Sequence, residues 1–314
     1  MSTNDLASKP FRILSLDGGG AKGFYTLGVL REVEMMLKCP IYEAFDLIFG
    51  TSTGAIIAAL LALGKSVDDV YALYKQHVPS VMKPLVPSSK SLALNTLASE
   101  VFGDATFLDV RTSVGLVATK WVIERPMIFK GDAKQAHGRV DSFSPGFGCT
   151  VSDAVQASCS AYPFFKRKIV VTDKDDHIEL VDGGYSANNP TLYAIADAIG
   201  PMQIPIEAIR VLSIGVGEYP RPKHHPLKPR WWLDLLPSVR LLQKTLEINT
   251  QSMDQLRAVL FNHIRTVRVN ENFNQPTMAT DLLEHDLDKL NILRQRGGES
   301  YAKREAEIRD LLLR

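Results

Sequence analysis

The stretch FDLIFGTSTGAIIAALLAL, residues 45–63, decides the fold. Its first part, 45–49, is a short apolar run typical of a buried strand, and the apolar run after Gly54 is typical of a buried helix. Gly-x-Ser-x-Gly separates the two runs, with Ser52 at its centre. Because the glycines let a strand and a helix approach without a Cβ clash, we predict a strand–turn–helix unit that points the Ser52 hydroxyl outward. The plain alternative is a helix-entry turn capped by Ser or Thr.

The same alternation of apolar runs and helical stretches continues on both sides of this unit. It predicts an α/β fold, a three-layer sandwich in which a mostly parallel central sheet lies between helices. The predicted strands are residues 11–16, 45–49, 114–123, 126–129, 169–171, 178–181 and 209–214. The predicted helices are residues 23–38, 54–63, 67–77, 91–101, 151–158 and 191–199.

The composition changes after residue 217. A stretch rich in proline and basic residues, 219–230, leads into long helical patterns and one strand-like run, at 235–261, 281–314 and 266–269. We therefore predict two parts, an α/β domain over residues 11–217 and a mainly helical C-terminal lobe, 218–314, packed on it.

The overall composition is that of a globular protein. The 314 residues are 45% hydrophobic and 23% charged, which excludes a disordered or fibrous chain. A net charge of +1 argues against non-specific binding of DNA or RNA. The three cysteines form no Cys-x-x-Cys pair, the first residues carry no signal-peptide core, and the longest apolar run, 55–63, is too short to cross a bilayer. These features lead us to expect a cytoplasmic protein with reduced thiols.

A glycine-rich loop, Asp-Gly-Gly-Gly-Ala-Lys-Gly at residues 17–23, joins the first predicted strand to the first helix. The backbone N–H groups of Gly18, Gly19 and Gly20 can converge on one point and bind developing negative charge. Lys22 opposes the dipole of the following helix, so an anion-binding role explains it better than local stability does. Such donors are what the oxyanion of an acyl transfer needs.

The glycine loop also matches Gly-x-Gly-x-x-Gly, so a dinucleotide-binding fold is an alternative. That fold needs an acidic residue at the end of the next strand. Here the next strand ends in the Gly-x-Ser-x-Gly turn, with no acidic residue. The Gly-Lys-Ser/Thr of a P-loop is also absent, so the sequence disfavours both nucleotide folds.

An activated serine needs a base. Asp182-Gly183-Gly184 follows the predicted strand 178–181. An aspartate at the carboxyl end of a strand is well placed to reach a serine at the edge of the sheet. The alternative interpretation of Asp182 is an Asp-Gly turn without a chemical role.

These motifs, in this order along the chain, resemble the patatin-like phospholipases. The resemblance covers residues 11–217 and rests on four segments, 17–23, 50–54, 157–165 and 182–184. It implies a patatin-like sheet between helices, hydrolysis of glycerophospholipid acyl esters, a Ser–Asp dyad without histidine, and no metal or other cofactor. Carried over by motif, Ser52 is the nucleophile and Asp182 the base. The amides of Gly18, Gly19 and Gly20 are then the donors of the oxyanion hole.

A narrower resemblance is to the phospholipase effectors of the bacterial anti-phage systems called CBASS. It rests on residues 23–30, 156–165, 185–194, 249–256 and 278–296. It implies that a cyclic dinucleotide from a partner nucleotidyltransferase switches the lipase on, with formation of a homo-oligomer. The enzyme then degrades phospholipid at the inner face of the membrane. Two alternatives stay open, a constitutive acyl hydrolase and a non-catalytic nucleotide-binding module on the glycine loop.

The remaining features give weaker indications. Arg221, Arg230 and Trp231 belong to a basic and aromatic stretch that suits a nucleotide or a membrane surface, and equally a solvated proline-rich loop. Residues 82–95, rich in proline and serine, predict a mobile loop over the acyl site. No histidine has a glycine-rich strand-end setting, and no pair has metal-ligand spacing, so we expect neither a catalytic histidine nor a metal.

Overall fold

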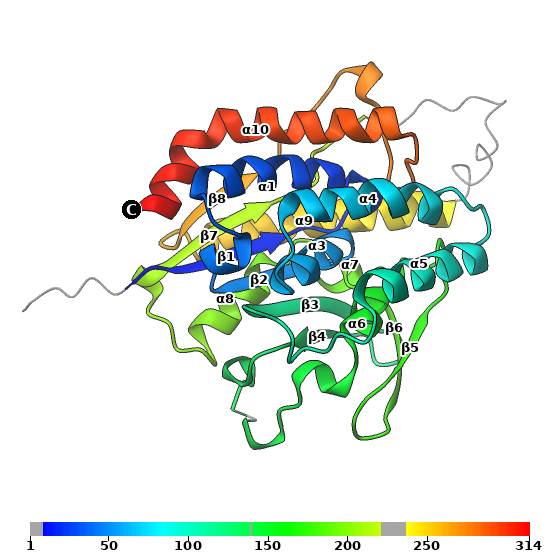
Figure 1. Cartoon of the computed structure of the whole chain (residues 1–314), viewed down its shortest axis with the longest axis horizontal. Helices are drawn as coiled ribbons and strands as arrows, with labels where there is room; N and C mark the ends of the chain where they lie inside the picture. Colours follow the sequence, from blue (N-terminus) through cyan, green and yellow to red (C-terminus); the bar gives the residue numbers. More distant parts are fainter. Residues whose placement is uncertain (1–8, 139, 221–236) are drawn as a thin grey trace, which may run out of the picture.

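A computed structural model describes residues 9–138, 140–220 and 237–314. It confirms the predicted α/β fold class, a mixed and mostly parallel sheet with helices on both faces (Figure 1). Among the described residues the sheet has eight strands in the order β5-β6-β3-β2-β1-β7-β8, with β4 paired to β3. The run β3-β2-β1-β7-β8 is parallel, whereas β4, β6 and β5 are antiparallel to their neighbours.

The elements agree with the predicted pattern to within a few residues at most positions. The strands are β1 (Phe11–Leu16), β2 (Leu47–Thr51), β3 (Ser113–Lys120), β4 (Arg125–Lys130), β5 (Lys168–Val171), β6 (His177–Asp182), β7 (Ile209–Ile214) and β8 (Arg265–Val269). The helices are α1 (Gly23–Leu37), α2 (Ile41–Ala44), α3 (Thr53–Ala62), α4 (Val67–Met82), α5 (Pro87–Phe102), α6 (Val151–Ser158), α7 (Gly184–Ala187), α8 (Thr191–Ile199), α9 (Pro237–Leu260) and α10 (Leu287–Leu313).

Successive side chains of the central strands enter two separate cores, because neighbouring residues of a strand face opposite ways. Leu14 and Leu16 of β1 belong to the larger core, which α1, α3, α4, α5, α6 and α10 cover. Ile13 belongs to the smaller core, which is closed by α7 and α8. The central strands are therefore buried on both faces, as their nearly continuous apolar sequences require.

The register of the sheet brings three loops to one edge. Leu16 of β1 pairs with Gly50 of β2, so the glycine loop and the serine turn leave the sheet side by side. β6 runs antiparallel to β3 and places Asp182 opposite Ala118. This residue of β3 is one position beyond the partner of the last residue of β2, so Asp182 ends its strand next to the serine turn.

The part of the chain after residue 217 contributes to the sheet as well as covering it. β8 pairs in parallel with β7, so the predicted boundary at residue 217 falls between two neighbouring strands of one sheet. α10 packs closely along α1, where Gly28 and Gly297 face each other. A Cβ on Gly28 would lie 2.0 Å from the Arg294 carbonyl oxygen, so only glycine permits this approach.

The predicted mobile loop at residues 82–95 is wrong. α4 continues to Met82, and α5 begins at Pro87, where the fixed φ of proline suits the first turn of a helix. Leu94 and Leu97 of α5 are buried against the core. The proline and serine residues thus mark a helix start instead of an irregular lid.

Candidate active site

Ser52 stands on a strained turn between β2 and α3, which confirms the predicted strand–turn–helix unit. Its φ of 52° and ψ of −121° are unusual for a residue with a side chain. The glycines of the motif are sterically required, since a Cβ on Gly50 would lie 2.2 Å from the Gly54 carbonyl oxygen. The Ser52 N–H donates to Ser158 Oγ at 2.9 Å, and this hydrogen bond holds the turn in place. Strain that surrounding contacts maintain is typical of functional sites.

Asp182 lies beside Ser52, at the end of β6, and its residue is 2% exposed. Its Oδ1 accepts a hydrogen bond of 2.7 Å from the Gly184 N–H. Burial raises the pKa of Asp182 from 3.8 to about 6, although the Gly184 N–H and a hydrogen bond from the Ser52 hydroxyl favour the charged form. A carboxylate that titrates near neutral pH and lies beside a serine hydroxyl can accept the proton of that hydroxyl.

Cys159 is the other reactive group next to Ser52. Its thiol interacts with the Ser52 side chain and is buried, and burial together with the charge of Asp182 raises the pKa of the Cys159 thiol well above its ordinary value. The thiol is therefore neutral and a poor nucleophile. Ser158 is buried too, and its hydroxyl donates to the Val117 carbonyl at 2.5 Å. Ser52 is the hydroxyl with both a carboxylate partner and a strained backbone.

The glycine loop faces the same point, but its three amides differ. The Gly18 N–H donates to the Asn188 carbonyl at 2.9 Å, so this predicted oxyanion donor is already engaged. For Gly19 and Gly20, no hydrogen bond of the backbone N–H is found within the described residues. Gly20 has a φ of +57°, and a Cβ there would lie 2.4 Å from the Leu282 carbonyl oxygen. The loop thus presents two N–H groups next to the serine turn.

Ser52, Asp182, Gly19 and Gly20 open into one apolar cavity of about 60 Å³, called here the acyl cavity. Its apolar walls come from α3, α4, α5, the segment before β5, α9 and the segment before α10. They are formed by Ile56, Val78, Val81, Met82, Leu94, Leu97, Ala161, Phe164, Phe165, Leu246, Leu282 and Leu283. This volume has room for only a few water molecules. The apolar walls of the cavity suit a hydrocarbon chain, but the cavity is narrow in the described conformation.

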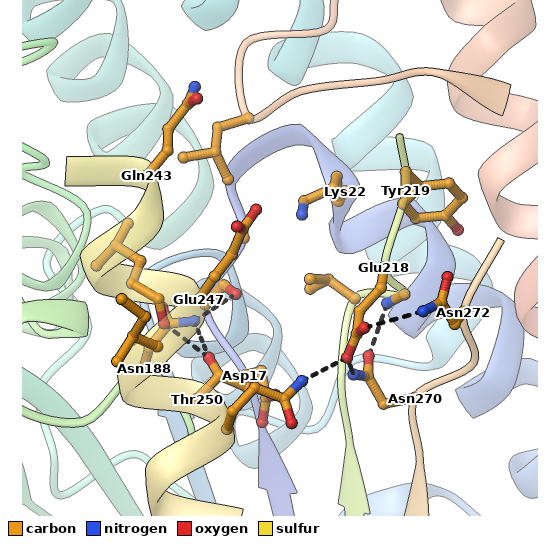
Figure 2. Close-up of a pocket in the computed structure, with 18 of the residues that line it drawn as sticks. Asp17, Lys22, Asn188, Glu218, Tyr219, Gln243, Glu247, Thr250, Asn270 and Asn272 are labelled. Carbon is orange, nitrogen blue, oxygen red and sulfur yellow. Dashed lines mark hydrogen bonds between the residues drawn. The ribbon is translucent and has the colours of Figure 1, made fainter. Parts of the chain in front are cut away.

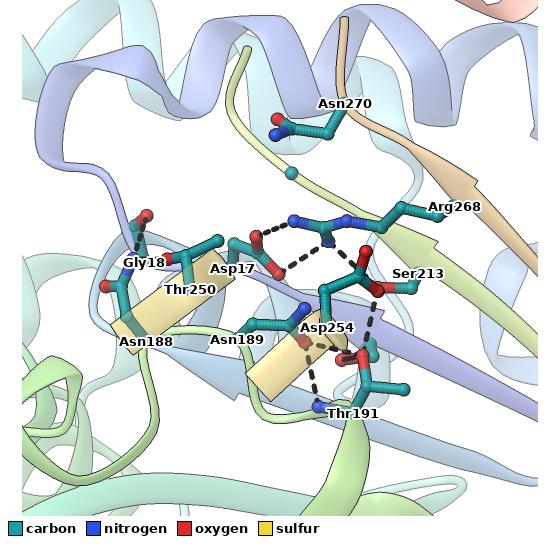
Figure 3. A network of polar contacts seen from close by, with 12 residues as sticks. Asp17, Gly18, Asn188, Asn189, Thr191, Ser213, Thr250, Asp254, Arg268 and Asn270 are labelled. Carbon is teal, nitrogen blue, oxygen red and sulfur yellow. Dashed lines mark hydrogen bonds and ion pairs between the residues drawn. The ribbon is translucent and has the colours of Figure 1, made fainter. Parts of the chain in front are cut away.

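A buried ion pair anchors the residue that precedes the glycine loop (Figure 3). Arg268 of β8 forms a two-pronged pair with Asp17, with Nη1 and Oδ1 2.9 Å apart, and its guanidinium also donates to Ser213 Oγ. Ser213 in turn contacts the Thr191 hydroxyl at the start of α8. The network ties β1, β7, β8 and α8 together under the loop. Asp17 belongs to a recognisable sequence motif, whereas no motif marks its partner Arg268, which lies 251 residues away along the chain.

Other predicted residues do not join this site. Arg221, Arg230 and Trp231 lie outside the described residues. Within residues 9–138, 140–220 and 237–314, no histidine lines the acyl cavity, and no three His, Cys, Asp or Glu side chains cluster as a metal site would require. Over the same residues, no helix combines the length and the apolar character needed to span a membrane.

The fold and the site define a class of protein. The family profile "Patatin-like phospholipase" matches residues 14–195, and the chain belongs to this family of lipid acyl hydrolases. The "cUMP-AMP-activated phospholipase" of Escherichia coli is 61% identical over 96% of this chain and 94% of its own length. The "cGAMP-activated phospholipase" of Escherichia coli strain TW11681 is 29% identical over 69% of this chain and 66% of its own. Among solved structures, VipD from Legionella pneumophila matches 97% of this chain and 68% of its own with a TM-score of 0.50 and 12% identity, a likeness of fold alone.

Proposed function

We propose that this chain hydrolyses the acyl esters of membrane glycerophospholipids with Ser52 as nucleophile and Asp182 as base. The observation that carries the proposal is that a serine on a strained turn and a buried carboxylate, whose pKa is raised to about 6, line the same cavity. The amides of Gly19 and Gly20 complete the site as oxyanion donors. Gly18, which the sequence also placed among the donors, positions the loop through Asn188 instead.

The reaction proceeds in two steps through one covalent intermediate. Asp182 accepts the proton of Ser52 as Oγ attacks the acyl carbonyl carbon, and the negative charge develops on the carbonyl oxygen in front of the two amides. Collapse breaks the ester bond, and the proton from Asp182 passes to the leaving alcohol of the lysophospholipid. Asp182 then takes a proton from water, which attacks the acyl group on Ser52; as the bond to Oγ breaks and the fatty acid leaves, Asp182 returns the proton to Ser52 Oγ. No metal enters this scheme.

We further propose that a cyclic dinucleotide switches the activity on. The name of the 61% identical relative supports this, since it is a phospholipase activated by cUMP-AMP. The small volume of the acyl cavity supports it as well, because a wider cavity would be needed to hold a whole fatty acyl chain. To convert a 1% active population to 99%, the nucleotide must bind the open state about ten-thousand-fold more tightly, or by about 5.5 kcal/mol.

The same proposal includes the source of the nucleotide, the oligomeric state of the active form and the location of the substrate. A partner nucleotidyltransferase supplies the nucleotide, the active form is a homo-oligomer, and the substrate lies in the inner face of the membrane. A constitutive lipase is the alternative. It predicts full hydrolysis without nucleotide.

The test is release of fatty acid from phosphatidylethanolamine–phosphatidylglycerol vesicles, measured by mass spectrometry with and without cUMP-AMP. Wild type should be slow alone and strongly accelerated by the nucleotide. Ser52→Ala, Asp182→Asn and the double variant should each lose roughly a thousandfold or more, without additivity, because the two residues act as a unit. Ser99→Ala, an exposed serine of α5, is the matched control and should behave as wild type. Near-normal turnover by Asp182→Asn would refute the dyad, and full activity without nucleotide would refute the switch.

A further inference from the structure

A second and larger cavity lies on the other side of the glycine loop. Its volume is about 660 Å³, within the range of small-molecule sites. Figure 2 shows α9 on one side of this cavity and the segments that follow β7 and β8 on the other, with Lys22 of the glycine loop between them. We call it the polar cavity. Gly19, Asn188, Leu246 and Leu282 line both this cavity and the acyl cavity, so the two share a wall.

The lining of the polar cavity is rich in side-chain amides. They come from α9 and from the segments beside it, namely Asn188, Gln243, Gln251, Gln255, Asn270, Asn272 and Asn274. Each amide offers donors and an acceptor on one planar group, which is the pattern that matches the edges of nucleobases. An acyl chain cannot form hydrogen bonds with such a lining. The lining therefore indicates a polar ligand.

The charges of the cavity suit a nucleotide better than a simple anion. Lys22, in the first turn after the glycine loop, supplies a cation for phosphate. The carboxylate of Asp17 is neutralised by Arg268, and that of Glu218 accepts hydrogen bonds from Gln251 and Asn270. Glu247 and Asp281 also line the cavity, and carboxylates there repel a free anion but can accept hydrogen bonds from ribose hydroxyls or base amino groups.

Asn188 connects the polar cavity to the serine site. Its carbonyl accepts from the Gly18 N–H, and its Nδ2 donates to the Gly18 carbonyl at 3.2 Å and to Thr250 Oγ1 at 2.6 Å. Its own N–H donates to Asn249 Oδ1 at 2.8 Å. Asn249 and Thr250 belong to α9, whose Leu246 lines both cavities. A ligand that shifts α9 must therefore also shift the oxyanion loop and a wall of the acyl cavity.

We propose that the polar cavity is the binding site of the activating cyclic dinucleotide, with α9 and Asn188 as the connection to the oxyanion loop. The amides and carboxylates of the cavity contact the bases and riboses, and Lys22 contacts a phosphate. The inference rests on the proposed nucleotide control. It adds the location of the nucleotide site and the contacts through which nucleotide binding affects Gly18.

The test is calorimetric titration of the full chain with cUMP-AMP, alongside a mixture of AMP and UMP and inorganic phosphate. Wild type should bind cUMP-AMP and neither of the other probes measurably at the same concentrations. Gln251→Ala and Asn272→Ala remove amides of the lining one at a time, and the two combined should weaken cUMP-AMP binding about tenfold. Gln76→Ala, an exposed glutamine of α4, is the matched control and should bind as wild type.

The outcomes separate the site from the proposed function. If wild type is activated by cUMP-AMP and the cavity variants bind it with wild-type affinity, the site is wrong while nucleotide control stands. If wild type neither binds nor responds to any cyclic dinucleotide, both fail. A photo-crosslinking azido-adenine form of cUMP-AMP gives a second readout on unmodified protein, and it should label peptides from residues 243–255 or 270–282. Labelling confined to other peptides would overturn the inference even if a variant failed to fold.

The connection through Asn188 has its own readout. Asn249→Leu keeps most of the side-chain volume on α9 but removes the amide oxygen that accepts from the Asn188 N–H, and Asn249 is not among the residues that line the polar cavity. Binding of cUMP-AMP should stay within about threefold of wild type, while the acceleration of hydrolysis should fall at least tenfold. Full acceleration in this variant would show that the signal does not pass through Asn188.

Discussion

Replacing Asp182 with asparagine should make the protein more stable while removing its activity. The carboxylate is buried, and its pKa is raised from 3.8 to about 6 mainly by burial. A raised pKa means that ionisation costs the folded state free energy, and this rise corresponds to about 3 kcal/mol at pH values above 6. Asparagine is neutral and nearly the same shape. Its Oδ1 can keep the hydrogen bond from the Gly184 N–H.

The sign of the pH dependence follows from the same pKa. As pH falls from 6 toward 3.8, Asp182 takes up a proton in the folded state before it does so in the unfolded chain, so the wild type gains stability relative to the asparagine variant. The advantage of Asp182→Asn should be about 3 kcal/mol at pH 8. It should be about half as large at pH 5 and close to zero at about pH 3.

Urea denaturation at pH 8 and pH 5 measures this difference directly. Asp104→Asn, at an exposed position, is the matched control and should leave the free energy of unfolding unchanged at both pH values. An Asp182→Asn variant that is no more stable than wild type at pH 8, or whose advantage does not shrink at pH 5, would refute the view that burial of a charged base is maintained for catalysis.

Three further results are expected. The value of kcat/KM should rise with pH around a midpoint of about 6, because Asp182 must be ionised to accept a proton; a flat profile between pH 5 and pH 8 would contradict this role. Arg268→Met should lower the free energy of unfolding by about 3–5 kcal/mol by leaving Asp17 buried and unpaired, and adding Asp17→Asn should recover part of the loss in urea denaturation. EDTA should leave the hydrolysis rate unchanged; a loss that calcium restores would require a metal in the mechanism.

The sequence revealed those parts of the fold and site that are encoded by neighbouring residues. The Gly-x-Ser-x-Gly turn around Ser52 and the Asp-Gly-Gly after β6 are local patterns, with glycines that steric contact requires. Residues 82–95 were misjudged because proline and serine occur both in loops and at helix starts. Only the burial of Leu94 and Leu97 against distant elements decides in favour of α5.

Contacts between segments that are distant along the chain have no comparable local pattern in the sequence. Arg268 lies on β8, and nothing in its surroundings along the chain marks it as the partner of Asp17. The engagement of the Gly18 N–H depends on the position of the Asn188 carbonyl, which the packing of α7 against β3 and α9 defines. The polar cavity likewise combines α9 with loops from four separate regions. No periodicity in any one of them predicts it.

The most direct measurement of the central claim is covalent labelling of the serine. Purified chain, activated with cUMP-AMP, is treated with a fluorophosphonate, and the modified peptide is identified by mass spectrometry. A single adduct on Ser52 is expected, because only a serine activated by a base and facing an oxyanion hole reacts readily. Asp182→Asn should form this adduct at least a hundredfold more slowly. An adduct on another residue, such as Ser160, or labelling of Asp182→Asn at the wild-type rate would contradict the assignment of Ser52 and Asp182 as the catalytic dyad.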